Sequence, residues 1–220
     1  MAILLAGAAG ARADGIACST VTGNLISNCG FEDGNFTDWT VGGATYGGFD
    51  GNFYGVQGNE NDSPAGATAL GPVDTGSWAA YFASDTTQTI APITLSQTLT
   101  GPEDVVYTIS FYIDQDGYTA DNSVSVTFAG ADVYSVTNMA QTSNFALETI
   151  TYTDRTVVNP TLEFSFENVP AYFFLDDVSV TEAPIAPEPP GLLLCGSAMG
   201  LLLLARRKRR GASSRKGILR

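Results

Sequence analysis

The sequence predicts an all-β fold, an antiparallel β-sandwich of the jelly-roll type, with a single hydrophobic helix near the C-terminus. In the second half of the chain, segments rich in Val, Ile, Thr, Tyr and Phe alternate apolar and polar residues, as half-buried strands do. No stretch among them shows a helical period. A separate apolar run occupies residues 191–205 and is followed by a cluster of basic residues.

Five strands are expected from this alternation, and Gly, Pro, Asn and Asp mark the turns between them. They cover residues 93–99, 105–113, 123–128, 162–166 and 173–180. Many short alternating strands form two antiparallel sheets packed face to face. We therefore expect one β-sandwich domain over residues 14–183 of the 220-residue chain.

Residues 24–76 differ in composition: they are rich in Gly, Asn and Asp, with aromatic residues spaced among them. This pattern predicts loops and edge strands around the first sheet. Trp39, at the start of an expected strand, is predicted to lie in the core. Aromatic side chains on loops can stack on sugar rings, although most aromatic residues fill cores. The candidates for a surface that binds polysaccharide are Tyr46, Phe49, Phe53 and Tyr54.

The net charge of −13 is unevenly distributed. Between residues 14 and 187 the only basic residue is Arg155, whereas 22 of the 23 acids, all but Glu188, lie in that interval. Such a domain repels phosphate backbones, which excludes nucleic acid as a partner. An acidic surface suits solubility, high salt or divalent cations.

The sequence shows no catalytic signature. It has no His, which excludes Ser-His-Asp and Cys-His systems and His-ligated metals. No P-loop or dinucleotide-binding glycine pattern occurs. Paired carboxylates can hydrolyse glycosides, but nothing distinguishes a pair such as Asp114 and Asp116 from the other acids. The sequence therefore predicts a protein without enzymatic activity.

The C-terminal tail has three parts. A Pro-rich linker, residues 184–190, contains Pro187, Glu188 and Pro189; the apolar run 191–205 follows, and the basic segment 206–220 ends the chain. The run is short for a membrane-spanning helix, which takes about 20 residues. Positive charges directly after it place the preceding domain outside the cytoplasm. A marginal anchor of this kind indicates a transient signal.

This order of Pro-Glu-Pro, short apolar helix and basic residues resembles the PEP-CTERM sorting signal of Gram-negative bacteria. The resemblance implies that an exosortase, a membrane protease and transpeptidase, cleaves the chain near residues 187–189. The protein would then be anchored transiently in the inner membrane and sorted to the cell surface or extracellular matrix. An ordinary single-pass anchor is the alternative, and it also places the domain outside.

The N-terminal region agrees with export. Residues 1–13 are apolar and end in Ala-Arg-Ala, a small-residue cleavage pattern, so we interpret them as the remnant of a signal peptide that starts upstream. In an oxidising compartment Cys18 and Cys29 are expected to form a disulfide. Such a bond would stabilise the domain by about 2–3 kcal/mol. Cys195, within the apolar run, is expected to pack against its neighbours.

A second resemblance comes from the two ends of the domain. The segment NLISNCGFEDG at residues 24–34 and the segment YFFLDDVSV at residues 172–180 are similar to the opening and the final strand of galactose-binding-like jelly rolls. This group includes carbohydrate-binding modules of xylanases. The resemblance implies a structural calcium ion held by Glu32 and by Asp176 or Asp177.

The chemistry of adjacent carboxylates leaves two alternatives for that site. Strict alternation in a strand that contains Leu175 and Val178 would turn one Asp inward, where a charge needs a cation or several hydrogen bonds. Calcium would recruit six to eight oxygen ligands. Hydrogen bonds from backbone amides would stabilise the carboxylate without a metal.

Two classes of function follow. The first is a binding module that holds extracellular polysaccharide through aromatic and polar side chains. The second is a structural or adhesive surface protein without a defined sugar ligand. Exposed candidate aromatic residues would favour the first, and buried ones beside an exposed strand edge would favour the second.

Overall fold

The computed structural model describes residues 15–43, 54–59, 70–83, 92–117, 122–168 and 171–185. The chain divides into two compact units, residues 1–185 and 186–220. The second unit lies outside the described residues, as do the expected signal-peptide remnant, the sorting motif Pro187–Glu188–Pro189 and the expected C-terminal helix. The fold described below is that of the first unit.

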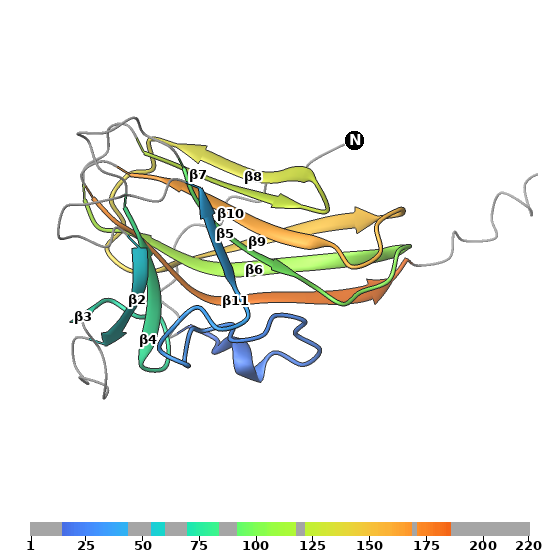
Figure 1. Ribbon diagram of the computed structural model, residues 1–220, viewed down its shortest axis with the longest axis horizontal. Helices are drawn as coiled ribbons and strands as arrows, with labels where there is room; N and C mark the ends of the chain where they lie inside the picture. Colours follow the sequence, from blue (N-terminus) through green and yellow to red (C-terminus); the bar gives the residue numbers. More distant parts are fainter. Residues whose placement is uncertain are drawn as a thin grey trace, which may run out of the picture. The chain divides into compact units, whose positions relative to one another are not determined.

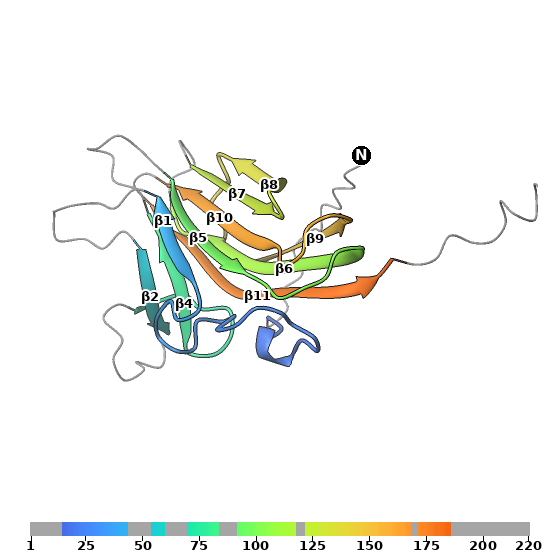
Figure 2. The same cartoon turned by 45° about the vertical axis from the view of Figure 1, so that its right-hand side comes forward.

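Two sheets form the domain, and they appear as two layers in Figures 1 and 2. Sheet A has the strand order β1 (Thr40–Gly43), β5 (Ile93–Thr98), β10 (Thr161–Glu167), β7 (Ser123–Phe128) and β8 (Ala131–Thr137). Sheet B has the order β3 (Leu70–Gly71), β2 (Tyr54–Asn59), β4 (Trp78–Phe82), β11 (Phe173–Pro184), β6 (Val105–Gln115) and β9 (Ala146–Asp154). A short 3₁₀ helix, η1 (Cys18–Thr20), precedes them. The predicted all-β sandwich is confirmed.

Every strand pair is antiparallel except β2 with β3, within the described residues. Alternation directs one face of each sheet inward. In β10, for example, Leu162, Phe164 and Phe166 are buried whereas the residues between them are half-buried. The side-chain pattern read from the sequence therefore corresponds to the observed inner faces.

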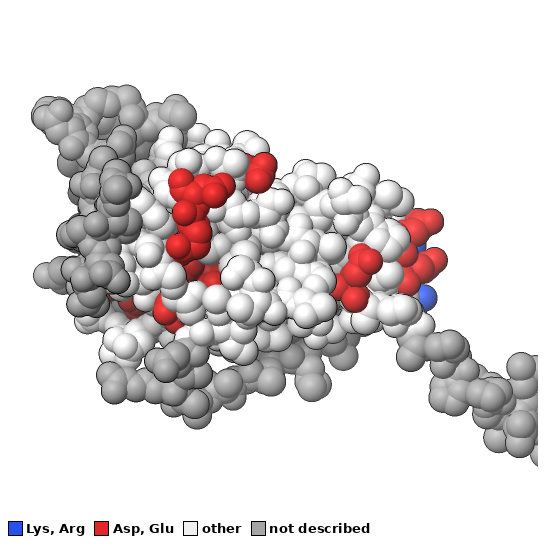
Figure 3. Space-filling model, turned by 90° about the horizontal axis from the view of Figure 1, so that it is seen from below, with Lys and Arg blue, Asp and Glu red and all other residues white. Residues whose placement is uncertain are grey.

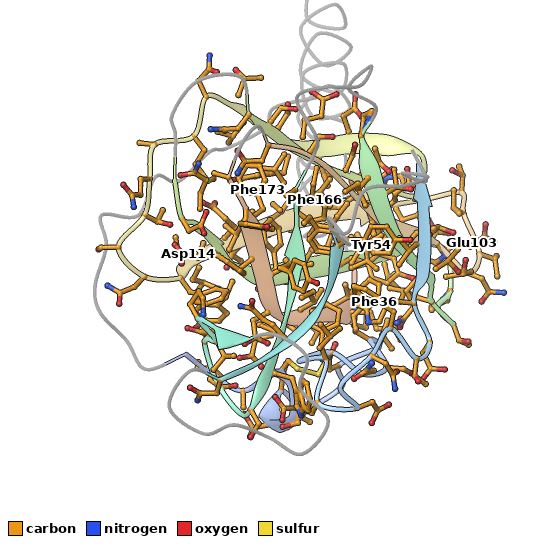
Figure 4. All side chains as sticks on the ribbon, turned by 60° about the vertical axis from the view of Figure 1, so that its left-hand side comes forward. Phe36, Tyr54, Glu103, Asp114, Phe166 and Phe173 are labelled. Carbon is orange, nitrogen blue, oxygen red and sulfur yellow. A yellow bond between two sulfur atoms is a disulfide. The ribbon has the colours of Figure 1, made fainter. Side chains whose placement is uncertain are left out.

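The core joins aromatic rings from both sheets. Phe82 of sheet B stacks on Phe166 of sheet A with ring centroids 4.2 Å apart. Phe111 and Phe164 meet edge to face at 5.1 Å. Figure 4 shows Phe166 and Phe173 in the middle of the domain, whereas Asp114 lies nearer its rim. Such pairs add to the free energy gained by burial, so they fix how the sheets face each other.

Residues 15–30, which we call the covering segment, precede β1 and cover part of sheet B. In both ribbon views this blue segment lies beside β4 and β11, and its Ile26 side chain belongs to the core. Backbone hydrogen bonds join it to β11: Leu25 N–H donates to the Val180 carbonyl at 2.8 Å, and Val178 N–H donates to the Cys29 carbonyl at 2.9 Å. Trp39, 7% exposed, packs in the core as predicted.

The predicted disulfide between Cys18 and Cys29 is present, with Cα atoms 6.0 Å apart. It closes the covering segment on itself beside β11. Within the described residues, no helix is long and apolar enough to span a membrane.

Candidate functional site

The outer face of sheet B carries the candidate site. Alternation places Tyr81 of β4, Phe174 of β11 and Asp114 of β6 on this face, because their neighbours Phe82, Phe173 and Ile113 belong to the core. These three residues form one row across the strands: Tyr81 pairs with Phe174, and Phe174 pairs with Asp114. Gly55 of β2 continues the row beyond Tyr81.

Three aromatic rings cluster on this row, and we call Tyr81, Tyr172 and Phe174 the aromatic face. The Tyr172 ring meets Tyr81 edge to face with centroids 5.9 Å apart, and it stacks on Phe174 at 6.1 Å. Phe174 is 4% exposed, whereas Tyr172 is 38% exposed. Burial and the neighbouring Tyr172 hydroxyl raise the pKa of Tyr81. The cluster therefore combines the buried ring of Phe174, the half-buried ring of Tyr81 and the exposed ring of Tyr172.

A glycine makes room for this cluster. A Cβ atom on Gly55 would lie 2.7 Å from the Tyr81 hydroxyl oxygen and 2.8 Å from its ring carbons. Real Cβ atoms do not approach ring atoms so closely, so any larger residue at position 55 would displace the Tyr81 ring. The lack of a Cβ atom at Gly55 lets the Tyr81 ring lie over the neighbouring strand β2.

Carboxylates lie at the edge of the aromatic face. Asp114 is 6% exposed and accepts a hydrogen bond from the Thr142 hydroxyl. Burial raises the pKa of Asp114, an effect that the hydrogen bonds from Thr142 and from the Gln115 backbone oppose. Asp116 is exposed, and its Oδ1 accepts the Tyr172 N–H at 2.8 Å. Asp116 thus fixes the backbone that carries the exposed ring.

The adjacent row of the same sheet is covered. Asp176 of β11 pairs with Tyr112 of β6, and Tyr112 pairs with Leu147 of β9. The covering segment reaches this row, because the Ile16 N–H donates to the Tyr112 hydroxyl oxygen at 3.2 Å. The loop 72–77 reaches it too: Asp74 N–H donates to Asp176 Oδ2 at 2.9 Å.

The two aspartates lie differently from the prediction. We expected strict alternation to turn one of them inward, but β11 has a bulge between Asp176 and Ser179, and Asp177 has a φ of 47°. Asp tolerates this left-handed conformation better than most residues. The extra residue lets Leu175 and Val178 both enter the core, while both carboxylates lie beneath the loop 72–77.

Protein donors surround this aspartate pair. Asp176 Oδ1 accepts the Asp177 N–H at 2.7 Å. Asp177 accepts the Cys18 N–H at 2.6 Å and the Thr75 hydroxyl, also at 2.6 Å. Burial and the charge of Asp177 raise the pKa of Asp176 well above its usual range, and the amide bonds oppose that rise. The residue Gly30 lies against both carboxylates, with its Cβ position 3.4 Å from Asp177 and 3.5 Å from Asp176.

Glu32, the third predicted calcium ligand, holds the same loop from its other end. It is exposed, and its carboxylate accepts the Ser77 N–H at 3.0 Å and the Trp78 N–H at 3.2 Å. The loop 72–77 is thus held by Asp176 and Asp177 on one side and by Glu32 on the other. Together with Asn59 and Gly71, this loop lines a cavity of about 380 Å³. The structure thus brings all three predicted residues to one loop.

The residues fit a calcium ion in part. Each carboxylate oxygen has a second lone pair, and the buried pair of like charges would gain from a cation. However, backbone amides already bind these oxygens, which is the metal-free alternative. Among the described residues no group of three Asp, Glu, Cys or His side chains is arranged to hold a metal ion. Calcium therefore stays a prediction.

Of the predicted sugar-binding residues, Tyr46, Phe49 and Phe53 lie outside the described residues. Tyr54 begins β2 and is half-buried on the inner face, where its ring lies 6.4 Å from that of Phe36. Both rings are among the labelled side chains in the middle of Figure 4. Tyr54 thus packs against the core and does not form the exposed surface that we expected of it.

The sequence interpretation missed the aromatic face. One signal could have identified it: Tyr172 and Phe174 are two residues apart and flank Phe173, so they share a face if Phe173 points inward. Tyr81 likewise precedes Phe82, so Tyr81 points outward if Phe82 points inward. The sequence predicted no surface role for these rings, because aromatic residues in strands are usually buried in the core.

Comparison with known proteins gives a likeness of fold. A Stig cyclase, Fisc from Fischerella sp. TAU, aligns at 17% identity over 73% of this chain and 97% of that chain, with a TM-score of 0.50. A second cyclase from Fischerella sp. TAU, in complex with 4-(1H-indol-3-yl)butan-2-one, aligns at 15% identity over 76% and 100%, also with a TM-score of 0.50. At such identities the likeness concerns the fold alone.

The galactotriose-bound module TmCBM61 aligns at 21% identity over 73% of this chain and 99% of that chain, with a TM-score of 0.48. No family model matches the chain, and no curated protein does. The resemblance to PEP-CTERM signals therefore stays a prediction from the quoted tail residues.

Proposed function

We propose that this domain is an exported jelly-roll module that binds extracellular polysaccharide through the aromatic face, without catalysing a reaction. The observation that carries the proposal is the Tyr172 ring, exposed above a base of two further rings on the outer face of sheet B. The C–H face of a sugar ring is apolar and flat, so it packs on an aromatic ring while its hydroxyl groups bond polar neighbours.

The polar neighbours needed for such a site are present. Asp116 and Gln141 are exposed at the end of sheet B where β6 ends and β11 begins, and the Gln141 amide donates to the Asp116 carbonyl at 3.2 Å. Export agrees with the disulfide, because such bonds persist in oxidising compartments. Delivery by an exosortase through the inner membrane completes the proposal.

A structural or adhesive role without a sugar ligand is the second candidate. It is favoured by β9, a nine-residue strand at the edge of sheet B with Leu147 48% exposed. An exposed strand edge can pair with a strand of another protein.

A binding assay distinguishes the two. The full chain, produced in an oxidising compartment, would be tested against glycan arrays and insoluble polysaccharides. We expect Tyr172→Ala to weaken binding at least about tenfold, which is about 1.4 kcal/mol. The control is Val158→Ala, which removes an exposed apolar side chain beyond the end of β9. A folded protein that binds no glycan, or binding that Tyr172→Ala leaves intact, would refute the proposal.

A further inference from the structure

The charge around the aromatic face is negative. Asp114 pairs directly with Phe174, and Asp116 binds the backbone of Tyr172. Arg155, the only Lys or Arg among the described residues, follows Asp154, which pairs with Val105 at the opposite end of β6. Val105 and Asp114 are nine residue steps apart along β6, which corresponds to about 30 Å.

The surface view shows how scarce basic side chains are on the face that it presents. Figure 3 shows acidic side chains in several groups, whereas blue is visible at one end of the domain only. The sequence adds that every other residue between 14 and 187 is uncharged or acidic. A polysaccharide that bears carboxylates or sulfates would therefore be repelled along the whole domain.

We propose that the aromatic face binds a polymer of amino sugars with free amines, and that Asp114 and Asp116 pair with the ammonium groups of that polymer. This inference rests on the proposed function, since it names the class of glycan for the same site. It assigns two roles: the rings hold the sugar faces, and the carboxylates select the positive charge.

Asp114 is suited to this role by its position. Asp114 as a whole residue is 6% exposed, so a ligand would reach only its small exposed part, and no Lys or Arg of the described residues lies beside it. Removal from water destabilises the ionised form, and burial accordingly raises the pKa of Asp114. An ammonium group of the ligand would restore the lost stabilisation, because ion pairs gain strength where water is scarce.

The rings favour the same ligand. An ammonium group within about 6 Å of a Tyr or Phe ring is attracted by the negative face of the ring. Tyr172 and Phe174 lie next to the two carboxylates, so one glucosamine unit could contact both kinds of group. Acetylation of the amine removes the charge and leaves the sugar backbone unchanged, which provides a matched pair of ligands.

The experiment compares glucosamine oligomers with N-acetylglucosamine oligomers of equal length by calorimetry at mildly acidic pH. The proteins are the full chain, Asp114→Asn and, as a control, Glu163→Gln. Asn keeps an oxygen that can accept the Thr142 hydroxyl. Glu163 lies on β10 between the core residues Leu162 and Phe164, so its side chain is on the outer face of the other sheet.

We expect the unmodified chain to bind the free-amine oligomer more tightly than the acetylated one. Asp114→Asn should reduce affinity for the free-amine oligomer about tenfold and leave affinity for the acetylated oligomer unchanged, whereas Glu163→Gln should change neither. Added salt should weaken only the free-amine complex.

Equal affinity for the two oligomers, with both lost in Tyr172→Ala, would overturn the inference and leave the proposed function standing. A preference for free amines that Asp114→Asn retains would also overturn it, because the attraction would then be that of the whole acidic domain. If neither these oligomers nor any other glycan binds the folded chain, the proposed function fails as well.

Discussion

Two neighbouring rows of residues on the outer face of sheet B differ in whether other segments of the chain cover them. The row with Asp176 and Tyr112 lies under the segment 15–30 and the loop 72–77, whereas the row with Tyr81, Phe174 and Asp114 has Tyr172 exposed above it. We call them the covered row and the open row.

Both rows contain carboxylates removed from water, but their partners differ. The covered carboxylates receive backbone amides from three separate segments of the chain. The open one receives the Thr142 hydroxyl and a neighbouring amide. A buried carboxylate with many protein donors holds a fold together, and one with few can engage a ligand. The comparison teaches that burial alone does not distinguish a structural acid from a binding acid.

The largest effect should come from opening the covered row. Replacing Cys18 and Cys29 with Ser frees the segment whose Cys18 N–H binds Asp177. We expect the free energy of unfolding to fall by about 2–3 kcal/mol, measured by urea denaturation. Glycan binding by the protein that remains folded should be unchanged. An equal loss of binding would show that the two rows are not independent.

Calcium should act on the covered row alone. If the ion binds at Asp176, Asp177 and Glu32, calcium at 100 times its dissociation constant raises the free energy of unfolding by about 2.7 kcal/mol. Asp177→Asn should abolish this rise in thermal denaturation with calcium against chelator. Asp33→Asn, on an exposed acid next to Glu32, is the control. An identical melting temperature with calcium and with chelator would favour the amide-only alternative.

Gly55→Ala should affect the open row alone. The new Cβ meets the Tyr81 hydroxyl, so the ring must shift and the aromatic face must change shape. We expect glycan affinity to fall about threefold to tenfold, with a loss of stability under about 1 kcal/mol. Val158→Ala, on an exposed residue away from the site, is the control. Unchanged affinity would exclude Tyr81 from the binding surface.

The smallest effect concerns pH. The folded-state pKa of Asp114 is raised by burial, so this group contributes stability that is fully present below its unfolded pKa, about 3.9. That contribution is lost as pH rises through the folded pKa, with a slope of at most about 1.4 kcal/mol per pH unit. Asp114→Asn should flatten this part of the stability curve from acidic to neutral pH. A curve parallel to that of the unmodified chain would contradict the assignment.

Much of the fold was predictable. The five expected strands correspond to β5, β6, β7, β10 and β11, and in β5, β7 and β10 buried residues alternate regularly with less buried ones. β4, β8 and β9 were missed. β4 is a short interior strand whose sequence, WAAYF, does not alternate apolar with polar residues. β8 and β9 lie at sheet edges, where their inner residues are only half-buried and the apolar half of the pattern weakens. Alternation reports burial, so it is weakest where a strand has a neighbour on one side only.

The candidate site was predictable in its covered part only. The motif around Asp176 and Asp177 resembles a known family, and the disulfide follows from two nearby cysteines. The bulge was not foreseeable, because Asp177 reaches its left-handed conformation through contacts with Cys18 and Thr75, which are distant in sequence. The aromatic face requires rings from two strands to meet, and single-strand patterns do not specify such pairs.

One strand relates the open row to the rest of the chain. β11 begins at Phe173, next to the exposed Tyr172, and ends at Pro184, close to the end of the domain. Its length, about 35 Å, separates the two ends of the domain. The chain therefore leaves the domain on the side remote from the aromatic rings.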